Sequence, residues 1–527
     1  MKAFLRRFGG LVLGILSGFD RLVFRGKLCP LYSPDGMNIY LSANKVLRKD
    51  FEEHAHRVTQ QVLRASMIDQ AKASDRFRYL ASSNTDKDKV ARAFAAKHKV
   101  GEGLVCVLQC VEPCWSYTLD SKEMKDGTKM LTVQGKQRKC SHLYHYFIDP
   151  QFGWMYVRLQ TWFPFEMQVY VNGREWLSRM MAKEKLRHQR SDNKILWVED
   201  WQRAQQLLEE QLQTNWPTVL DAWQRQVHPL HPGHLGKMSL DYNWTVHQSE
   251  WASDVAFASR AELDRWMPLW QRQALNFDSS EVLRFFARTG RVYGKSPLTV
   301  ETEWKRYYEG LRIKHWVNSN SLKLYDHLNV ARVETTINDT RFFKVFRASQ
   351  ADPEGPMDWR IMRRGVADLY RRAEVSQRVN ERYLEGMAVV KETRPVKELV
   401  EPLCARVSEP SKKECRKPER KVRALNPWSK EDGSLLRAIS DPRWMVAGIR
   451  NRDLVAILYP ATTSDAKEKR RRSSRVTRLL RLLRGHGLLQ KVPKTHRYQV
   501  SEKARTTMAA LFAAGDANPA ELVAKAA

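Results

Sequence analysis

The chain has 527 residues, too many for one hydrophobic core, and this length predicts about three domains. Hydrophobic residues make up 43% and aromatic residues 10% of it, a composition that excludes an intrinsically disordered chain. Lys and Arg outnumber Asp and Glu by 90 to 59, a net charge of +31 that favours a polyanionic partner, with nucleic acid the natural choice.

Residues 1–100 are expected to be mainly helical, with one long helix from about Leu41 to Ala73. An apolar run from Leu11 to Phe19 follows the first basic residues and has the outline of a signal peptide. The run is far shorter than the ~20 residues that span a bilayer, and no A-x-A-like cleavage site follows it. We therefore expect a buried strand or helix here and no membrane attachment.

Residues 101–240 are expected to form an antiparallel sheet followed by helices. Apolar and aromatic residues alternate in four runs, which turn signals such as Asn172-Gly173 separate. The four expected strands are 104–111, 141–148, 154–162 and 166–171. Helices are then expected over 174–187 and 197–226.

Residues 241–390 are expected to form a second α+β region. It contains a candidate hairpin at 321–338 and one more helix at 359–389, and no internal repeat is apparent. The next segment, 391–428, is rich in Pro, Lys, Arg and Glu and is expected to be a solvated linker. The predicted fold class is thus multidomain α+β, with an antiparallel sheet core, helices and a separate C-terminal domain at 429–515 before a tail at 516–527.

The C-terminal domain shows the strongest local pattern. A short amphipathic helix is expected over 450–459 and a second helix over 466–484, where Val476, Leu480 and Leu483 share one apolar stripe. Arginines recur on another face of the second helix. Between residues 466 and 505 there are 14 Lys or Arg and only two Glu, which predicts a basic surface on a packed scaffold.

A basic β-hairpin, 488–500, and a closing helix from about Ser501 follow the second helix. This order resembles the winged helix-turn-helix family, in the segment LLRLLRGHGLLQKVPKTHRYQVSEKAR. The resemblance implies that the second helix enters the major groove of duplex DNA and that the hairpin touches the backbone or minor groove. The residues it implies are Arg471, Arg472, Arg475, Arg478, Arg481, Lys491, Lys494, His496 and Arg497.

The hairpin at 321–338 gathers residues with catalytic chemistry. Lys323 and Tyr325 share one face of the first strand, Asp326 follows, and Glu334 shares a face of the second strand with Arg332. This K-x-Y-D … R-x-E pattern resembles rolling-circle replication initiators, which nick DNA with a tyrosine and a metal ion. The His-hydrophobic-His metal motif of that family is missing. The alternative, which we favour, is a cross-strand ladder of ion pairs.

A second acidic set comprises Asp241, Glu250 and Asp254. Glu250 and Asp254 are four residues apart and would share a helix face. Carboxylates that converge on Mg²⁺ can hydrolyse phosphodiesters, so Mg²⁺ is the cofactor expected if the protein is an enzyme. An ordinary polar helix face is the simpler interpretation.

Aromatic and basic residues alternate in the predicted sheet. Such a surface can stack the unpaired bases of a single strand, and the candidates are Tyr144, Tyr146, Trp154, Tyr156, Arg158 and Trp162. The alternative is an aromatic core face. Cys106, Cys110, Cys114 and Cys140 lack the paired spacing of zinc sites, and no metal site is assigned. The seven cysteines, an odd number, indicate a reducing compartment.

The whole chain resembles uncharacterised bacterial proteins of mobile-element type near GFDRLVFRG, RLQTWFPF, VYVNGREWL and RVETTINDTRFFKVFR. The leading hypothesis is a cytoplasmic, nucleoid-associated protein that binds duplex DNA through its C-terminal domain and single-stranded or structured DNA or RNA through its front domains. A metal-dependent nickase or nuclease is one alternative. A transcription regulator with a large sensor region is another.

Overall fold

The structure is a computed structural model of residues 1–527. It describes all of them except 124–126, 128, 229–237, 239, 288–298, 309, 350, 390–396, 398–399, 409–420, 442–443, 445–447, 493–494, 517 and 519–527. The chain divides into two compact units, unit 1 (Met1–Val390) and unit 2 (Lys391–Ala527).

Unit 1 is built on an 11-stranded sheet with the order β10-β11-β12-β13-β9-β1-β6-β5-β4-β3-β2. All neighbours are antiparallel except β2 and β3, which are parallel, so the sheet is mixed. Its strands are β1 (Val12–Leu28), β2 (Phe77–Leu80), β3 (Gly103–Glu123), β4 (Lys129–Asp149), β5 (Gly153–Gln160), β6 (Met167–Asn172), β9 (Tyr242–Phe257), β10 (Val300–Tyr307), β11 (Gly310–Val317), β12 (Asn320–His327) and β13 (Val330–Ile337). Two small hairpins are β7 (His188–Ser191) with β8 (Lys194–Val198), and β14 (Lys344–Arg347) with β15 (Asp358–Ile361).

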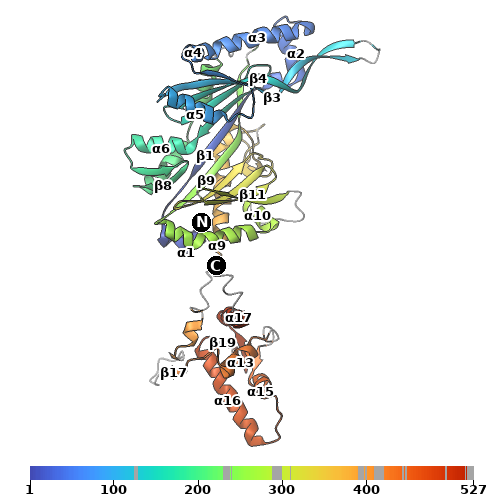
Figure 1. The fold of residues 1–527 in the computed structure, drawn as a ribbon. Coiled ribbons are helices and arrows are strands. Elements are labelled where there is room, and N and C mark those ends of the chain that lie inside the picture. Colours follow the sequence, from blue (N-terminus) through green and yellow to red (C-terminus); the bar gives the residue numbers. More distant parts are fainter. Residues whose placement is uncertain are drawn as a thin grey trace. The chain divides into compact units, whose positions relative to one another are not determined.

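The helices of unit 1 lie around this sheet (Figure 1). They are α1 (Lys2–Phe8), α2 (Pro34–Ala43), α3 (Phe51–Ala65), α4 (Ile68–Ala73), α5 (Lys87–Lys97), α6 (Gly173–Lys183), α7 (Trp201–Gln211), α8 (Trp216–Val227), α9 (Arg260–Asn276), α10 (Ser279–Phe286) and α11 (Leu369–Ala388). Short 3₁₀ turns occur at 9–11, 29–32, 48–50 and 366–368.

The two halves of the sheet have the same connections. In each half a long strand, β1 or β9, is followed along the chain by helices and then by a four-stranded meander, β3–β6 or β10–β13; the first half adds the short edge strand β2 between its helices. The last strand of each meander returns to pair with the long strand of its own half. β1 and β9 pair with each other over almost their full length, so the two halves meet there. The repeat is one of topology and has no counterpart in recurring residues of the sequence.

The two faces of the sheet have different coverings. On one face, α11 packs against β9 and β13, where the Asn380 amide donates to the Val333 carbonyl and accepts from Thr335. The other face carries α5 and α6. Its central side chains include polar and charged groups, because paired residues such as Lys323 and Glu334 project on the same side. This polar face is the one that bears the candidate site.

Several expectations for residues 1–240 are corrected. β1, the 17-residue strand at the centre of the sheet, lies within the region that was expected to be mainly helical. The single helix expected from Leu41 to Ala73 is replaced by the end of α2, then α3 and α4, because Met67 adopts a left-handed conformation between the last two. The helix expected at 197–226 is two helices, because Pro217 starts a new one at α8. The four strands expected in 101–240 are present as β3 to β6.

Unit 2 has its own hydrophobic core. Its helices are α13 (Lys430–Ile439), α15 (Asn451–Leu458), α16 (Ala466–Gly485) and α17 (Glu502–Asp516). Its small sheet has the order β18-β20-β19, with β18 (Ile449–Arg450), β19 (Leu489–Lys491) and β20 (Arg497–Val500). β16 (Val407–Ser408) pairs with β17 (Lys421–Val422). Leu403 and Leu425 are buried in this core, so parts of the expected solvated linker pack within unit 2.

Among the described residues, no helix combines the length and the apolar character that a membrane crossing requires.

Candidate functional site

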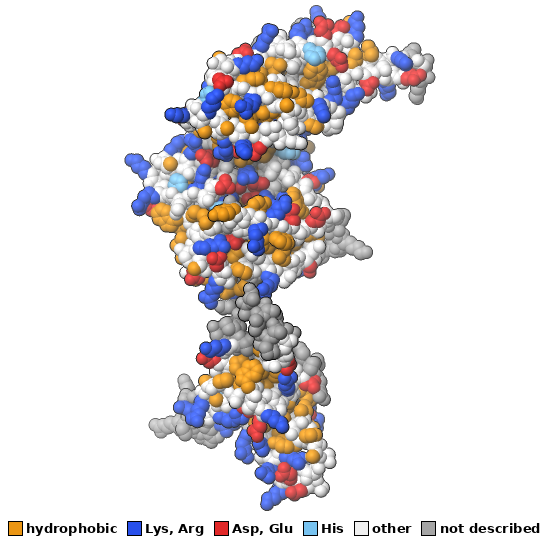
Figure 2. All heavy atoms as spheres, in the orientation of Figure 1, with side chains coloured by type: hydrophobic (Ala, Val, Ile, Leu, Met, Phe, Trp, Pro, Cys, Tyr) orange, Lys and Arg blue, Asp and Glu red, His pale blue; other side chains and the backbone are white. Residues whose placement is uncertain are grey.

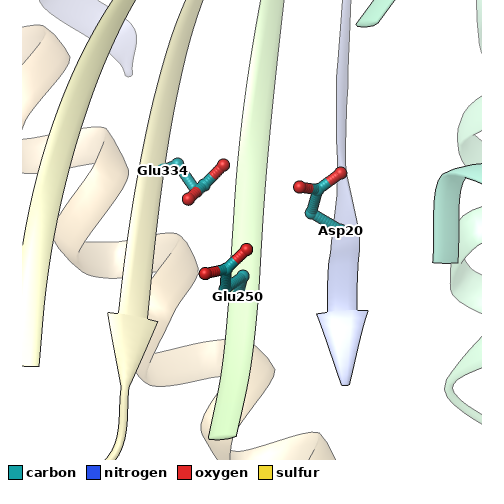
Figure 3. A group of neighbouring side chains, drawn as sticks. All are labelled: Asp20, Glu250 and Glu334. Atoms are coloured by element: carbon teal, nitrogen blue, oxygen red, sulfur yellow. The ribbon is translucent and has the colours of Figure 1, made fainter. Parts of the chain in front are cut away.

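Three carboxylates converge on the polar face, at the seam between the two halves. Asp20 comes from β1, Glu250 from β9 and Glu334 from β13, and their side chains point toward one another (Figure 3). One oxygen of each lies within 4.8 Å of the others, and all three residues are buried. A β-bulge between Phe19 and Arg21 interrupts the pairing with β9 at Asp20. Among the described residues, this is the group whose geometry could hold a metal ion.

Basic side chains occupy the spaces between these carboxylates. The Lys323 ammonium lies 2.5 Å from Glu334 and 3.5 Å from Glu250. The Arg332 guanidinium lies 2.5 Å from Asp254 and 3.3 Å from Asp20. The network also includes Arg21, which is 3.8 Å from Glu250, and Arg174, which is 3.4 Å from Asp254.

Charge therefore balances in this network. Asp20, Glu250, Asp254 and Glu334 supply four negative charges, and Arg21, Arg174, Lys323 and Arg332 supply four positive ones. A divalent cation would have to displace the Lys323 ammonium from Glu334. The arrangement fits the ion-pair interpretation better than a preformed metal centre, because a buried metal site normally presents an excess of negative ligands.

The pKa directions reflect the same contacts. Burial alone would raise the pKa of Asp20, but Arg332, Arg21 and Arg174 lower it. Burial and the neighbouring Glu334 raise the pKa of Glu250. The pKa of Lys323 is raised although burial opposes it, because Glu334 and Glu250 stabilise the ammonium. Asp20 and Lys323 are thus held charged, whereas Glu250 takes up a proton more readily than an ordinary glutamate.

The expected hairpin is present as β12 and β13. Lys323 pairs with Glu334 and Tyr325 pairs with Arg332, so these side chains share the polar face. Burial and Glu334 raise the pKa of Tyr325 to about 12, which is opposite to the change that would activate a nucleophile. Asp326 points elsewhere and binds Arg260 at 2.6 Å.

The second acidic set is only partly assembled. Glu250 and Asp254 share one face, as expected, but they lie on strand β9 and not on a helix. Asp241 is exposed and is no member of the carboxylate group.

Sequence reasoning missed Asp20, Arg174 and Asn193. The Asn193 amide donates to Asp20 at 2.8 Å, and the fully buried Arg174 donates to the Ala252 carbonyl at 2.8 Å. Asp20 carried a usable signal, because a carboxylate inside the apolar run GFDRLVF requires a buried partner.

The aromatic candidates lie mostly on the same polar face. Tyr146 pairs with Tyr156, which pairs with Tyr170 on β6. Tyr144 is buried, and its hydroxyl donates to Glu112, which also binds Arg158 at 3.0 Å. Trp162 is separate, because it follows β5 and its indole donates to the Tyr117 carbonyl at 3.0 Å.

The cysteine candidates do not assemble a metal site among the described residues. Cys106 and Cys110 are buried in an apolar cluster with Tyr144 and Tyr146, and burial raises the pKa of both thiols to about 12.

The basic candidates of unit 2 lie along α16 and the following hairpin. Arg471 and Arg475 are 80% and 60% exposed, and Arg478 is exposed as well. Arg472 instead packs on the Tyr459 ring and binds Glu468 at 3.2 Å. Arg481 and Arg497 are half-buried, Lys491 and His496 are exposed, and Lys494 lies outside the described residues.

Comparison with family models, with curated proteins and with solved structures found no match for this chain.

Proposed function

We propose that the protein binds nucleic acid and that unit 2 is a winged helix-turn-helix module whose helix α16 contacts duplex DNA. The observation that carries the proposal is the row of exposed arginines on α16, Arg471, Arg475 and Arg478. The other face of the same helix packs into the core of unit 2 through Val476, Leu480 and Leu483. A helix held in this way presents its charge in a fixed geometry that suits phosphates and base edges.

The order of elements supports the same proposal. Helices α13, α15 and α16 are followed by the β19–β20 hairpin, and β18, which precedes α15, joins β20 at the edge of that hairpin. This order is the one expected of a helix-turn-helix with a wing, and it supports the proposal. Lys and Arg side chains are also spread over the visible surface of unit 2 (Figure 2). The net charge of +31 adds a general attraction to polyanions.

The proposal is tested by the salt dependence of binding. Fluorescence anisotropy with a labelled 30-bp duplex would compare the parent protein with the triple variant Arg471→Gln, Arg475→Gln, Arg478→Gln. Each lost phosphate contact lowers the slope of log K against log salt by about 0.9, so the slope should fall by up to about 3.

A matched control removes the same charge elsewhere. Arg187, Arg341 and Arg378 of unit 1 are exposed and form only surface ion pairs, so their replacement by Gln should leave the fold intact. Equal losses of affinity in the two triple variants would contradict a role for α16.

The second candidate function is metal-dependent nicking of DNA, which the convergence of Asp20, Glu250 and Glu334 favours. Supercoiled plasmid incubated with the protein and Mg²⁺ or Mn²⁺ would be nicked, and Tyr325→Phe or Glu334→Gln would abolish the nicking. The balanced charges and the raised pKa of Tyr325 weigh against this candidate, so we place binding first.

A further inference from the structure

A hollow of about 830 Å³ opens on the polar face beside the carboxylate seam. Its floor is the sheet, and its walls come from α5 on one side and from α6 and the β7–β8 hairpin on the other. We call it the tyrosine groove, and its lining includes Arg92, Tyr156, Tyr170, Arg179 and Arg190. Arg21 and Asn193, which contact Asp20, also line it, so the groove reaches the edge of the charge network.

The floor of the groove is a ladder of aromatic rings. Tyr146, Tyr156 and Tyr170 face one another across three adjacent strands. The rings of Tyr156 and Tyr170 are 5.2 Å apart and within 7° of parallel, and both residues are half-buried. Trp154 continues the surface, with the Arg92 guanidinium 4.5 Å from its ring centroid. Flat rings that are partly open to solvent are the surfaces on which unpaired bases stack.

The rim of the groove carries two guanidinium groups that share one carboxylate. Arg179 and Arg190 both contact Glu175, so one carboxylate serves two guanidinium groups. Nε of Arg179 meets Glu175 only at 3.5 Å, and the other partner of that carboxylate is Nη2 of Arg190, at 2.7 Å. Two guanidinium groups on one carboxylate leave an excess positive charge at the rim, which an anionic ligand such as a phosphate would balance.

A second hollow on the same face favours an extended ligand. It measures about 640 Å³ and is lined by Arg25, Lys27 and Arg158 together with Tyr32 and Trp115, whose rings are stacked at 5.3 Å. It lies on the same face as the tyrosine groove, because Arg25 and Arg158 both pair with Gln168, two residues from Tyr170. Aromatic rings beside basic groups thus occur twice along one surface.

We propose that the tyrosine groove binds an unpaired nucleic-acid strand, with bases against Tyr156 and Tyr170 and phosphates at Arg179 and Arg190. The inference rests on the proposed function, that the protein binds nucleic acid, and it adds the substrate class of unit 1. Two guanidinium groups that share a single carboxylate match phosphate, and the size of the hollow suits a nucleotide. The second hollow, with aromatic and basic groups on the same face, favours a strand over a single nucleotide as the ligand.

The test measures the affinity of unit 1 for a single strand in a variant whose unit 2 has lost the exposed arginines of α16. Labelled dT10 and rU10 would be titrated in the background that carries Gln at 471, 475 and 478, and dTMP would serve as a competitor. Tyr156→Leu with Tyr170→Leu should weaken strand binding about five- to hundredfold for each base stacked. Arg179→Gln with Arg190→Gln should lower the salt slope by about 1.4, because each single-strand phosphate contact contributes about 0.7.

Matched controls separate stacking from folding. Tyr156→Phe with Tyr170→Phe retains the rings and should keep the parent affinity for the strand. Tyr79→Leu with Tyr307→Leu changes two exposed tyrosines outside the groove and should have no effect. Thermal unfolding of each variant would show that the fold persists.

Every outcome decides the proposal. Preferential binding of dT10 or of rU10 would identify the strand as DNA or RNA, and both support the groove. Parent-like strand binding by the Leu variants would overturn it, as would displacement of dT10 by dTMP at equal nucleotide concentration, which would indicate a mononucleotide site. A duplex assay in which the α16 arginines have no effect would not change these strand-binding results. The proposal for unit 2 and the proposal for the groove can therefore be rejected independently.

Discussion

Replacing Lys323 with Met should destabilise unit 1 by about 3–5 kcal/mol, the cost of removing one partner from a buried ion pair. Lys323 is 6% exposed, and its ammonium bridges Glu334 at 2.5 Å and Glu250 at 3.5 Å. Without it, the nearest positive charges are Arg332, 3.9 Å from Glu334, and Arg21, 3.8 Å from Glu250. Met preserves the apolar stem of the side chain, so the loss reports the charge and not a cavity.

Urea unfolding followed by tryptophan fluorescence measures this loss. Fifteen of the 17 tryptophans lie in residues 1–390, so the signal reports unit 1. The double variant Lys323→Met with Glu334→Met should recover much of the stability, because no unpaired charge then remains at that pair. A loss below about 1 kcal/mol in the single variant would refute a desolvated pair, since exposed pairs contribute no more than that.

The loss should also depend on pH. Lys323 lowers the pKa of Glu250, so removing the ammonium raises the folded-state pKa of Glu250 further, and a proton can then replace the missing charge. A group whose folded pKa is raised contributes stability below its unfolded pKa and loses it as pH rises. The deficit of Lys323→Met should therefore be largest near neutral pH and shrink as pH falls toward about 4.5.

Two further predictions concern other parts of the chain. The partners Lys87, Arg158 and Tyr144 overcome the effect of burial and lower the pKa of Glu112 to about 2, against an ordinary 4.5. The lowered pKa contributes roughly 3 kcal/mol to the stability of unit 1 above about pH 4.5, and this contribution is lost as pH falls toward 2. Glu112→Gln should therefore lower the stability measured by urea unfolding at pH 7 but not near pH 2. Leu425→Ala should cost unit 2 about 2–5 kcal/mol and speed hydrogen exchange in α16, whereas unchanged exchange would mean that the segment is the solvated linker its composition suggests.

Patterns that are local in sequence predicted structure well. The alternation of residues placed Lys323 with Tyr325 on one face of the first strand and Arg332 with Glu334 on one face of the second, and the register of β12 and β13 confirms both. The stripe Val476, Leu480 and Leu483 predicted one buried face of α16, and these residues are buried. In both cases neighbouring residues along a single element determine the pattern, so no distant contact is needed to read it.

Contacts between distant segments could not be predicted in the same way. Asp20 meets Glu250 and Glu334 only because β1 and β9 pair across more than 200 residues of sequence, and no local pattern encodes that pairing. The repeated topology escaped notice for the same reason, since it is expressed in strand order and not in recurring residues. Buried polar residues within apolar runs, such as Asp20, were the available signal for the seam.

The seam also constrains Gly173, the first residue of α6. A Cβ at this position would lie 2.2 Å from the Phe19 carbonyl oxygen, next to Asp20, and backbone cannot rotate away. Gly173→Ala must therefore separate α6 from β1, at about 1–3 kcal/mol for overpacking, and it should weaken strand binding because α6 carries Arg179.

The matched control is Gly10→Ala, where a Cβ would meet nothing within 4 Å. Urea unfolding and dT10 titration of the two variants would compare them directly. Equal stability and equal strand binding of Gly173→Ala and Gly10→Ala would contradict the prediction. The close contact of α6 with β1 would then have no part in positioning the charge network and the tyrosine groove.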